Sequence, residues 1–510
     1  MIAKCYTSTL HGIEAQTVIV EADLSKGLPA FHIVGLTDTI IKESSERIRS
    51  AIINSGFKFP QCRITVNLSP ADKRKYGSHY DLPMAMALLQ ASEQGPKFVW
   101  NDYAFFGELT LEGKVNGIPG LLPLVIAAEE QGIKNIVIPK ANEAEDCLLK
   151  AASVFTVKNL AEVINVVIGN GEKAIHKENE KREKPKLDFD EVYGQENAKR
   201  AMVIAAAGGH NLLMVGAPGA GKTMLAERFK YILPPLSYEE KIQLTKIYSV
   251  AGLLKENSSI VDERPFRKPY SLITDASMFG GGAIPRPGEV SLAHSGVLFL
   301  DEFTNFNSKC IAGLRKPIDD REIAISRKRD SVVYPCDFIL LLASNPCKCG
   351  FLGDEKRVCT CTANQLNSFR DKFHTPLLDR VDLFVEMNCV NFDEIENKEK
   401  LMSTDEMYKM VVKARKIQAK RFKNEAYKLN SKIEGDDFKK YCNLDIAQRA
   451  TLETAYEKMG LTMRGYYKII RLSRTIADLD DADEIEIPHI LEALQYRNKM
   501  ELRGDNKWKK

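Results

Sequence analysis

The sequence has 510 residues and lacks an uncharged apolar run of 18 residues, which excludes a transmembrane helix. Its first residues lack the pattern of a signal peptide, so we expect a cytoplasmic protein with no membrane partner. The 72 lysines and arginines nearly balance the 69 acidic residues, so a net charge of +3 does not by itself indicate nucleic-acid binding. No solenoid repeat and no aromatic ladder for stacking bases is present. Any basic binding surface must therefore be local.

Disulfides are not expected either. The eleven cysteines are an odd number and are scattered, apart from one cluster, which is typical of proteins in a reducing compartment. The length is sufficient for about three domains, each with its own core.

The chain divides by pattern into four segments. Residues 1–170 predict a mixed α and β domain, with strands at 17–22 and 63–68 and an amphipathic helix at 38–55. A further helix at 121–131 leads to a strand at 136–138. Residues 171–187 are polar and charge-dense, as in a linker. Residues 188–390 alternate helix and buried-strand patterns, which predicts a parallel sheet, and residues 391–510 are mostly helical by pattern.

One motif in the third segment is a complete phosphate-binding loop. An apolar strand at 212–215 leads into it and a helix pattern at 224–229 follows it, which is the context that the motif requires. Its backbone N–H groups would surround anionic oxygens, Lys222 would reach the β- and γ-phosphates of ATP, and Thr223 would hold Mg²⁺. The loop is Gly216-Ala217-Pro218-Gly219-Ala220-Gly221-Lys222-Thr223.

Two later strands end in residues suited to hydrolysis. The strand at 297–300 precedes Asp301 and Glu302, which we expect to hold Mg²⁺ and to polarise the attacking water, respectively. The apolar run at 338–344 ends at Asn345, which would orient the same water. Acids and asparagine also occur at ordinary turns, so these assignments depend on the phosphate-binding loop.

Four cysteines form two C-x-C pairs separated by nine residues. Four thiolates bind one Zn²⁺ tetrahedrally in a closed structural site, although C-x-C spacing is tighter than usual in zinc fingers. The alternative is a loop that carries four reduced cysteines. The residues are Cys347, Cys349, Cys359 and Cys361.

A predicted hairpin carries three cations at its tip. Strands at 323–326 and 331–334 are joined by Arg327, Lys328, Arg329 and Asp330. Such cations would follow a phosphate backbone without reading its sequence, and the alternative is a solvated basic turn. The glycine-rich segment 280–288 is flanked by further cations that could extend this surface: Arg264, Arg267, Lys268 and Arg286.

The order of these motifs resembles the AAA+ ATPases, and more narrowly their magnesium-chelatase-like branch and the ComM/YifB family. The likeness covers essentially the whole chain and is carried most clearly by segments 193–196, 206–213, 280–302 and 345–350. It implies that Arg380 is an arginine finger acting on a neighbouring subunit and that Arg464 is the sensor arginine of a helical lid. Val192, Tyr193, Gly194 and Gln195 would line the adenine pocket. Tyr270 and the region of Cys310 and Pro317 depart locally from the family pattern.

The first domain resembles the Lon protease domain over segments 107–115 and 132–142. A serine–lysine dyad would be required for proteolysis, but Leu122 occupies the lysine position and His79 or Tyr80 lies near the serine position. A dyad of Ser78 and Lys75 is the weaker alternative. We therefore expect a non-proteolytic domain with a role in binding or assembly.

The predicted fold is α/β: a Lon-protease-like α+β domain, an AAA+ P-loop α/β domain and a C-terminal helical lid. The resemblance implies an ATP- and Mg²⁺-dependent hexameric DNA motor that drives branch migration in homologous recombination or natural transformation, with recombination proteins as partners. The alternatives are a chelatase-like motor that remodels a protein partner and an ATP-dependent protease, against which Leu122 argues.

Overall fold

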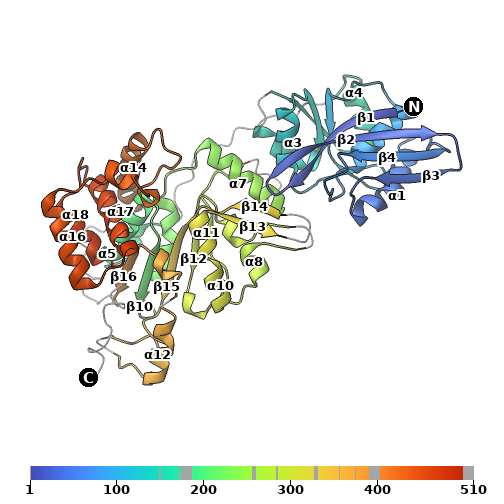
Figure 1. The fold of residues 1–510 in the computed structure, drawn as a ribbon. Helices are drawn as coiled ribbons and strands as arrows, with labels where there is room; N and C mark the ends of the chain where they lie inside the picture. The colour runs from blue at the N-terminus through green and yellow to red at the C-terminus, as the bar shows by residue number, and fades with distance from the viewer. Residues whose placement is uncertain are drawn as a thin grey trace.

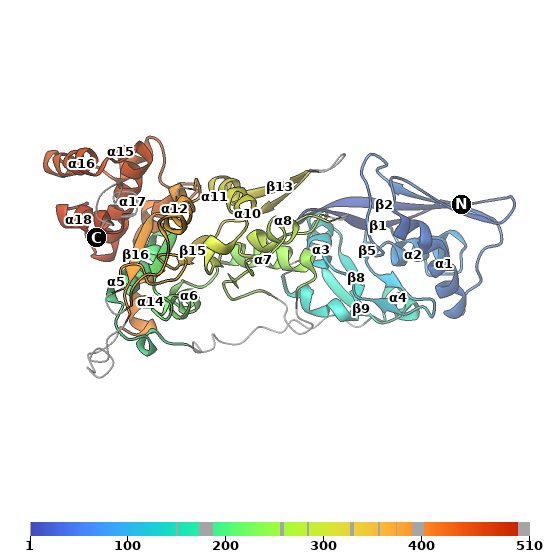
Figure 2. The same cartoon turned by 90° about the horizontal axis from the view of Figure 1, so that it is seen from below.

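The computed structural model describes residues 2–148, 151–171, 173, 187–254, 260–282, 285–326, 331–354, 357–373, 375–389 and 402–497. Three bodies follow one another along an elongated molecule: a mixed-sheet domain (blue), a parallel-sheet domain (green to yellow) and a group of helices (red), as Figure 1 shows. The view from below has the same order (Figure 2). The predicted linker at 171–187 lies almost wholly outside the described residues.

The N-terminal domain is built on a mixed sheet in the order β3-β4-β2-β1-β5-β8-β9. β1, β2 and β4 pair antiparallel, and the remaining neighbours pair in parallel. The strands are β1 (Ile2–His11), β2 (Glu14–Ser25), β3 (Ala30–Val34), β4 (Arg63–Ser69), β5 (Tyr103–Phe105), β8 (Asn135–Pro139) and β9 (Ser153–Val157). The other elements are α1 (Thr39–Asn54), α2 (Asp81–Ala91), β6 (Glu108–Leu109), β7 (Val115–Asn116), α3 (Leu121–Glu130), η1 (Lys140–Leu148) and α4 (Leu160–Val167).

The central domain contains a fully parallel sheet in the order β11-β12-β15-β10-β16. Its inner strands are uninterrupted apolar runs because helices cover both faces, which is how parallel sheets are usually buried. The strands are β10 (Leu212–Gly216), β11 (Phe266–Arg267), β12 (Val297–Leu300), β15 (Ile339–Ser344) and β16 (Leu383–Met387).

Short helices surround this sheet, and one antiparallel hairpin projects from it. The helices are η2 (Phe189–Glu191), α5 (Glu196–Gly208), α6 (Lys222–Arg228), η3 (Phe229–Ile232), α7 (Tyr238–Ala251), α8 (Asp275–Phe279), α9 (Glu289–Leu292), η4 (Phe303–Asn305), α10 (Ser308–Gly313), α11 (Arg315–Asp320), α12 (Ala363–Asp371) and η5 (Leu378–Arg380). The hairpin consists of β13 (Glu322–Ser326) and β14 (Ser331–Pro335), as predicted. It extends toward the N-terminal domain (Figures 1 and 2).

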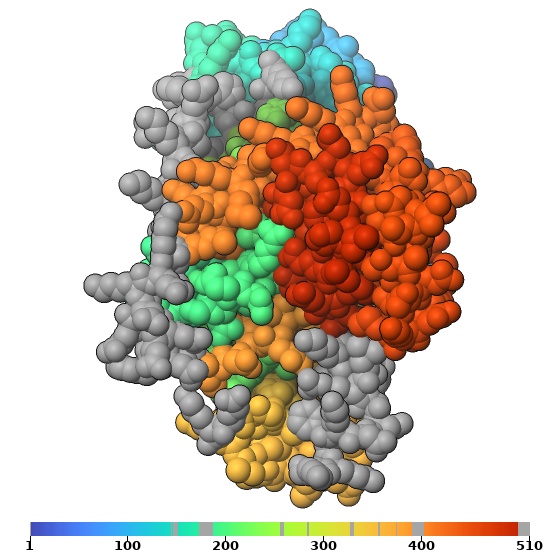
Figure 3. Space-filling model, turned by 90° about the vertical axis from the view of Figure 1, so that its left-hand side faces the viewer, coloured from blue at the N-terminus to red at the C-terminus, as the bar shows by residue number. Residues whose placement is uncertain are grey.

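The C-terminal helices form a lid that shares one apolar core with the central sheet. Figure 3 shows the red lid helices beside the green segment of α5, and α5 packs on α14 and α17. The lid elements are α14 (Thr404–Arg421), η6 (Asn430–Lys432), α15 (Asp437–Tyr441), α16 (Ile446–Met459), α17 (Met463–Leu479) and α18 (Ile487–Gln495). Lid and sheet therefore bury apolar side chains in one continuous core.

The N-terminal domain contacts the central domain at the tip end of the β13–β14 hairpin and along α7. Lys246 of α7 forms an ion pair with Glu14 of β2 at 3.0 Å, and Ser249 Oγ donates to Glu145 at 2.7 Å. Gly12, in the β1–β2 turn, lies directly against Val332 of β14. None of the helices in the described ranges combines the length and apolar character needed to span a bilayer.

Candidate functional site

The phosphate-binding loop connects β10 to α6 at the carboxyl edge of the parallel sheet. Gly219 and Gly221 adopt φ angles of +85° and +90°, a left-handed conformation that strains other residues. Gly216 has no room for a side chain, because an added Cβ would lie 2.4 Å from the Met387 carbonyl oxygen. The glycines of the motif are thus required by the turn and by the closeness of β16.

Lys222 joins the loop to the neighbouring strand. Its Nζ donates to the carbonyl oxygens of Gly216 at 2.6 Å and Ala217 at 2.9 Å, and to Asn345 Oδ1 at 3.1 Å. Burial lowers the pKa of Lys222, while the charges of Asp301 and Glu302 oppose that shift. β10 and β15 are adjacent, so the sheet itself brings Lys222 and Asn345 together.

The two carboxylates after β12 face this loop. Thr223 Oγ1 donates to Asp301 Oδ2 at 2.9 Å, so a hydroxyl and a carboxylate oxygen meet beside the phosphate-binding turn. These are oxygen donors of the kind that Mg²⁺ takes together with the phosphates of ATP, so the residues fit the ion. Glu302 is exposed, has a φ of +48° and accepts a hydrogen bond from Asn305 Nδ2 at 2.7 Å. Its carboxylate is available to polarise a water molecule.

Lys268 is a member of this site that the sequence assigned elsewhere. Its Nζ lies 3.2 Å from Asp301 Oδ2 and 3.6 Å from Glu227 Oε1. It follows β11, which pairs with β12, and this pairing brings Lys268 to Asp301. Nothing in the sequence indicates that the short β11 is part of the sheet.

The predicted adenine-pocket residues lie before α5. Tyr193 is exposed and Val192 is buried, while Gly194 and Gln195 both adopt a φ of +61°. Gln195 Nε2 donates to the carbonyl oxygen of Asn388, just beyond β16. This segment is therefore tied to the carboxyl edge of the sheet, where the phosphate-binding loop lies.

Arg380 and Arg464 lie at the opposite, amino edge of the sheet. Arg380 is 8% exposed and precedes β16, and its carbonyl oxygen accepts from Asn211, which precedes β10. Its guanidinium forms a double hydrogen bond with Asp319 at 2.9 and 2.7 Å, which raises the pKa of Arg380 and lowers that of Asp319. Arg464 lies 3.6 Å from Asp379. Both arginines line a cleft of about 570 Å³ that contains neither Lys222 nor Glu302.

Asp319 is a second residue that the sequence did not reveal. It lies in α11, and neither its spacing nor its neighbours distinguish it from a surface acid. Only the fold places it against Arg380.

Three of the four cations that we expected to extend the basic surface form ion pairs within the domain: Lys268, as described above, and the arginines Arg264 and Arg267. Both oxygens of Glu240 accept from Arg264 at 3.1 Å, and both oxygens of Glu289 accept from Arg267 at 2.6 Å. A guanidinium that binds a carboxylate through two hydrogen bonds adds little net charge to a surface. The hairpin-tip cations Arg327, Lys328 and Arg329 lie outside the described residues.

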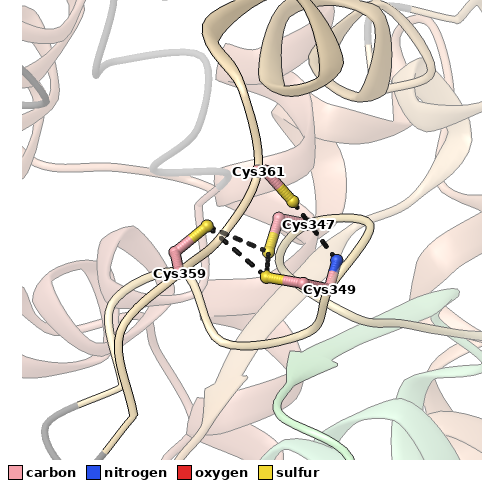
Figure 4. Close-up of side chains that lie close together, drawn as sticks. All are labelled: Cys347, Cys349, Cys359 and Cys361. Carbon is pink, nitrogen blue, oxygen red and sulfur yellow. Dashed lines mark hydrogen bonds between the residues drawn. The ribbon is translucent and has the colours of Figure 1, made fainter.

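The four clustered cysteines come together between β15 and α12 (Figure 4). Their sulfur atoms all lie within 4.8 Å of one another, and each cysteine is free of disulfide bonds. A soft divalent metal fits this set of donors, as the sequence predicted. The residues are Cys347, Cys349, Cys359 and Cys361.

The alternative dyad of the N-terminal domain does not form. Ser78 Oγ donates to Glu108, while the buried Lys75 donates to the carbonyl oxygen of Pro70. His79 and Tyr80 are buried, and burial lowers the pKa of His79 to about 4. Leu122 lies in the core and offers no base.

Among the local departures from the family pattern, Tyr270 is exposed, whereas Cys310 and Pro317 are buried.

Comparisons with known proteins agree with this architecture. Three models of the magnesium chelatase subunit ChlI match the chain: "Subunit ChlI of Mg-chelatase" at residues 20–142, "Magnesium chelatase, subunit ChlI" at 188–395 and its C-terminal part at 402–497. Lon protease of Geobacter metallireducens is 31% identical over 168 residues, which cover 31% of this chain and 20% of that protease. The predicted fold class, with a Lon-like first domain, a P-loop α/β domain and terminal helices, is confirmed.

Two relatives match over nearly their full length. YifB of Salmonella typhimurium is 39% identical over 505 residues, and competence protein ComM of Haemophilus influenzae is 36% identical over 506 residues. Each alignment covers 97% of both chains. The chain therefore belongs to the ComM/YifB family of magnesium-chelatase-like AAA+ ATPases.

Proposed function

We propose that the protein is a ring-forming, ATP-driven motor that moves DNA strands. Assembly into a ring is supported by the position of Arg380, which lies at the edge of the sheet opposite the phosphate-binding loop. Strands β10 and β16 pair in parallel over five residues, from Leu212 with Leu383 to Gly216 with Met387. At about 3.3 Å per residue, the paired part of these strands is about 13 Å long, and the two sites lie beyond its opposite ends. Arg380 therefore acts on the ATP of a neighbouring subunit, in a hexamer by resemblance to the family.

In such a ring each ATP lies between two subunits. One supplies Lys222 to the phosphates, Thr223 and Asp301 to Mg²⁺, and Glu302 to the attacking water. The next supplies Arg380, and with it Arg464, to stabilise the charge of the transition state. Asp319 holds Arg380 at the surface of the cleft until that contact forms.

DNA is the track that we propose for this motor. The β13–β14 hairpin carries three cations at its tip, and cations that follow a phosphate backbone bind without regard to sequence. A relative of nearly equal length is called a competence protein. These observations support branch migration during recombination or transformation, on branched or single-stranded DNA, together with recombination proteins.

The test is steady-state ATP hydrolysis with and without single-stranded, duplex and four-way-junction DNA. We expect strong stimulation by DNA, and a lower stimulation ratio when Arg327, Lys328 and Arg329 are all changed to alanine. In the matched control, three exposed lysines of α14 are changed to alanine, and we expect the same stimulation ratio as for the wild type. These lysines are Lys409, Lys416 and Lys420. Lys222→Ala should also abolish ATP-dependent movement of a labelled four-way junction.

A protein-remodelling motor is the second candidate, since the matching family models are those of a magnesium chelatase subunit. That function predicts turnover that is indifferent to every DNA and is stimulated by a protein partner. Hydrolysis of casein with covalent labelling of a serine would instead point to a protease.

A further inference from the structure

The four-cysteine cluster has the dimensions of a tetrahedral zinc site. Sulfur atoms at the corners of a tetrahedron with Zn–S distances of about 2.3 Å are about 3.8 Å apart. Cys347 Sγ lies 3.7 Å from Cys359 Sγ, and Cys349 Sγ lies 3.5 Å from Cys359 Sγ. The Cys347–Cys349 sulfur distance is 3.3 Å, well beyond a disulfide bond. Cys361 Sγ accepts a hydrogen bond from the backbone N–H of Cys349 at 3.3 Å, as metal-bound thiolates do.

The segment that carries these cysteines contains no helix or strand in its described part. It runs from the end of β15 at Ser344 to the start of α12 at Ala363. The backbone hydrogen bonds within its described part are short turns, from Gly350 N to the Cys347 carbonyl and from Asp354 N to the Phe351 carbonyl. A metal bound by all four cysteines would join its two halves.

This segment lies directly against the nucleotide site. Asn345, which accepts from Lys222 Nζ, is two residues ahead of Cys347 in the chain. Gly350 packs so closely on Pro218 of the phosphate-binding loop that an added Cβ would lie 2.6 Å from Pro218 Cδ. The cysteine cluster is thus connected to the nucleotide site in two ways: through Asn345 at the end of β15, and through the packing of Gly350 on the phosphate-binding loop.

We propose that Cys347, Cys349, Cys359 and Cys361 bind one Zn²⁺ that braces the phosphate-binding loop and holds Asn345 against Lys222. The zinc is structural and touches no phosphate. Its loss loosens the end of β15 and the packing on Pro218, so zinc binding and nucleotide binding are thermodynamically coupled. The proposal holds for either substrate of the motor, DNA or protein.

The first measurement is metal content. We expect about one zinc per chain in the purified protein by mass spectrometry of the elements. Cys359→Ser combined with Cys361→Ser loses this zinc, whereas Cys62→Ser, in the N-terminal domain, keeps it. A protein that carries iron in place of zinc, or that takes up no zinc on reconstitution, overturns the proposal.

The second measurement tests the coupling on the wild-type protein, so it does not depend on the folding of a variant. The affinity for a fluorescent non-hydrolysable ATP analogue is measured with zinc bound and after removal by a zinc-selective chelator in excess Mg²⁺. We expect weaker binding without zinc, on the order of tenfold, and recovery when zinc is restored.

Linkage requires the reciprocal effect. The analogue should raise the affinity for zinc, measured by competition with the chelator, by the same factor. Equal zinc affinity with and without the analogue would refute the bracing role, whatever DNA does to the rate of hydrolysis.

Discussion

Mixing two inactive variants tests whether Arg380 serves a neighbouring subunit. We predict that Arg380→Ala and Lys222→Ala each lower ATP turnover, by at least about 10³-fold for the arginine. The structure places the two side chains at opposite edges of a sheet whose strands here are five residues long. In the proposed ring, an intact site needs Lys222 from one subunit and Arg380 from the next.

The size of the recovery follows from this geometry. In a ring assembled at random from equal amounts of the two variants, half of the subunits retain the lysine and the other half retain the arginine. About one quarter of the interfaces then combine an intact Lys222 with an intact Arg380. The mixture should recover up to about one quarter of wild-type turnover at the same total concentration, measured as phosphate release.

A control and a contrary outcome make this test decisive. Arg315→Ala removes an exposed guanidinium that faces the same Asp319 at 4.0 Å, and we expect near-normal turnover. The mixture must be assembled from dissociated subunits, and exchange is checked with labelled protein. A mixture that exchanges subunits but shows no recovery would refute the argument, because sites completed within a single chain cannot be rescued by mixing.

Three further predictions concern hydrolysis, the lid and the domain contact. Glu302→Gln should bind ATP but lose turnover by about 10²- to 10⁴-fold, with ATP retained on filters; wild-type turnover would exclude its role as a base. Asp478 is fully buried and accepts hydrogen bonds from Arg421 at 2.7 Å and Arg474 at 3.0 Å. Asp478→Asn leaves both cations without their counter-charge and should lower the free energy of unfolding, measured in urea, by about 3–5 kcal/mol. Burial raises the pKa of Glu145, so its contribution to stability is full below the unfolded pKa of about 4.3 and declines as pH rises through the folded pKa. The glutamine of Glu145→Gln cannot ionise, so the unfolding temperature of this variant should decline less as the pH rises. An unchanged dependence of the unfolding temperature on pH would contradict this prediction.

Local patterns predicted the elements of this fold better than their arrangement. The helix expected at 38–55 is α1, the strands expected at 17–22 and 63–68 lie within β2 and β4, and the hairpin is confirmed. Each of these follows from periodicity or turn residues alone. The strand order does not, because β16 follows β15 in the chain yet pairs with β10. Placing Arg380 at the edge away from Lys222 required that order.

The same limit applies to the site. The phosphate-binding loop, Asp301, Glu302 and Asn345 each follow a recognisable apolar strand, so the sequence was sufficient to select them. Lys268 and Asp319 carry no such signal, since Lys268 follows a strand of two residues and Asp319 lies in a short helix. Their partners are set by tertiary packing, which the sequence pattern does not contain.

The N-terminal domain is joined to the central domain beside Leu122, the residue that we align with the protease lysine. The backbone N–H of Leu122, at the position of the lost lysine, donates to Glu145 at 3.0 Å, and the same carboxylate oxygen accepts from Ser249 Oγ of α7. The β1–β2 turn meanwhile packs on Val332 of the hairpin through Gly12, where an added Cβ would lie 2.8 Å from Val332 Cγ1. A shift of the hairpin therefore presses on the same domain that is fixed to α7. Because a glycine is needed at that contact, Gly12→Val should displace the tip end of the hairpin and change DNA-stimulated turnover without altering Lys222 or its partners.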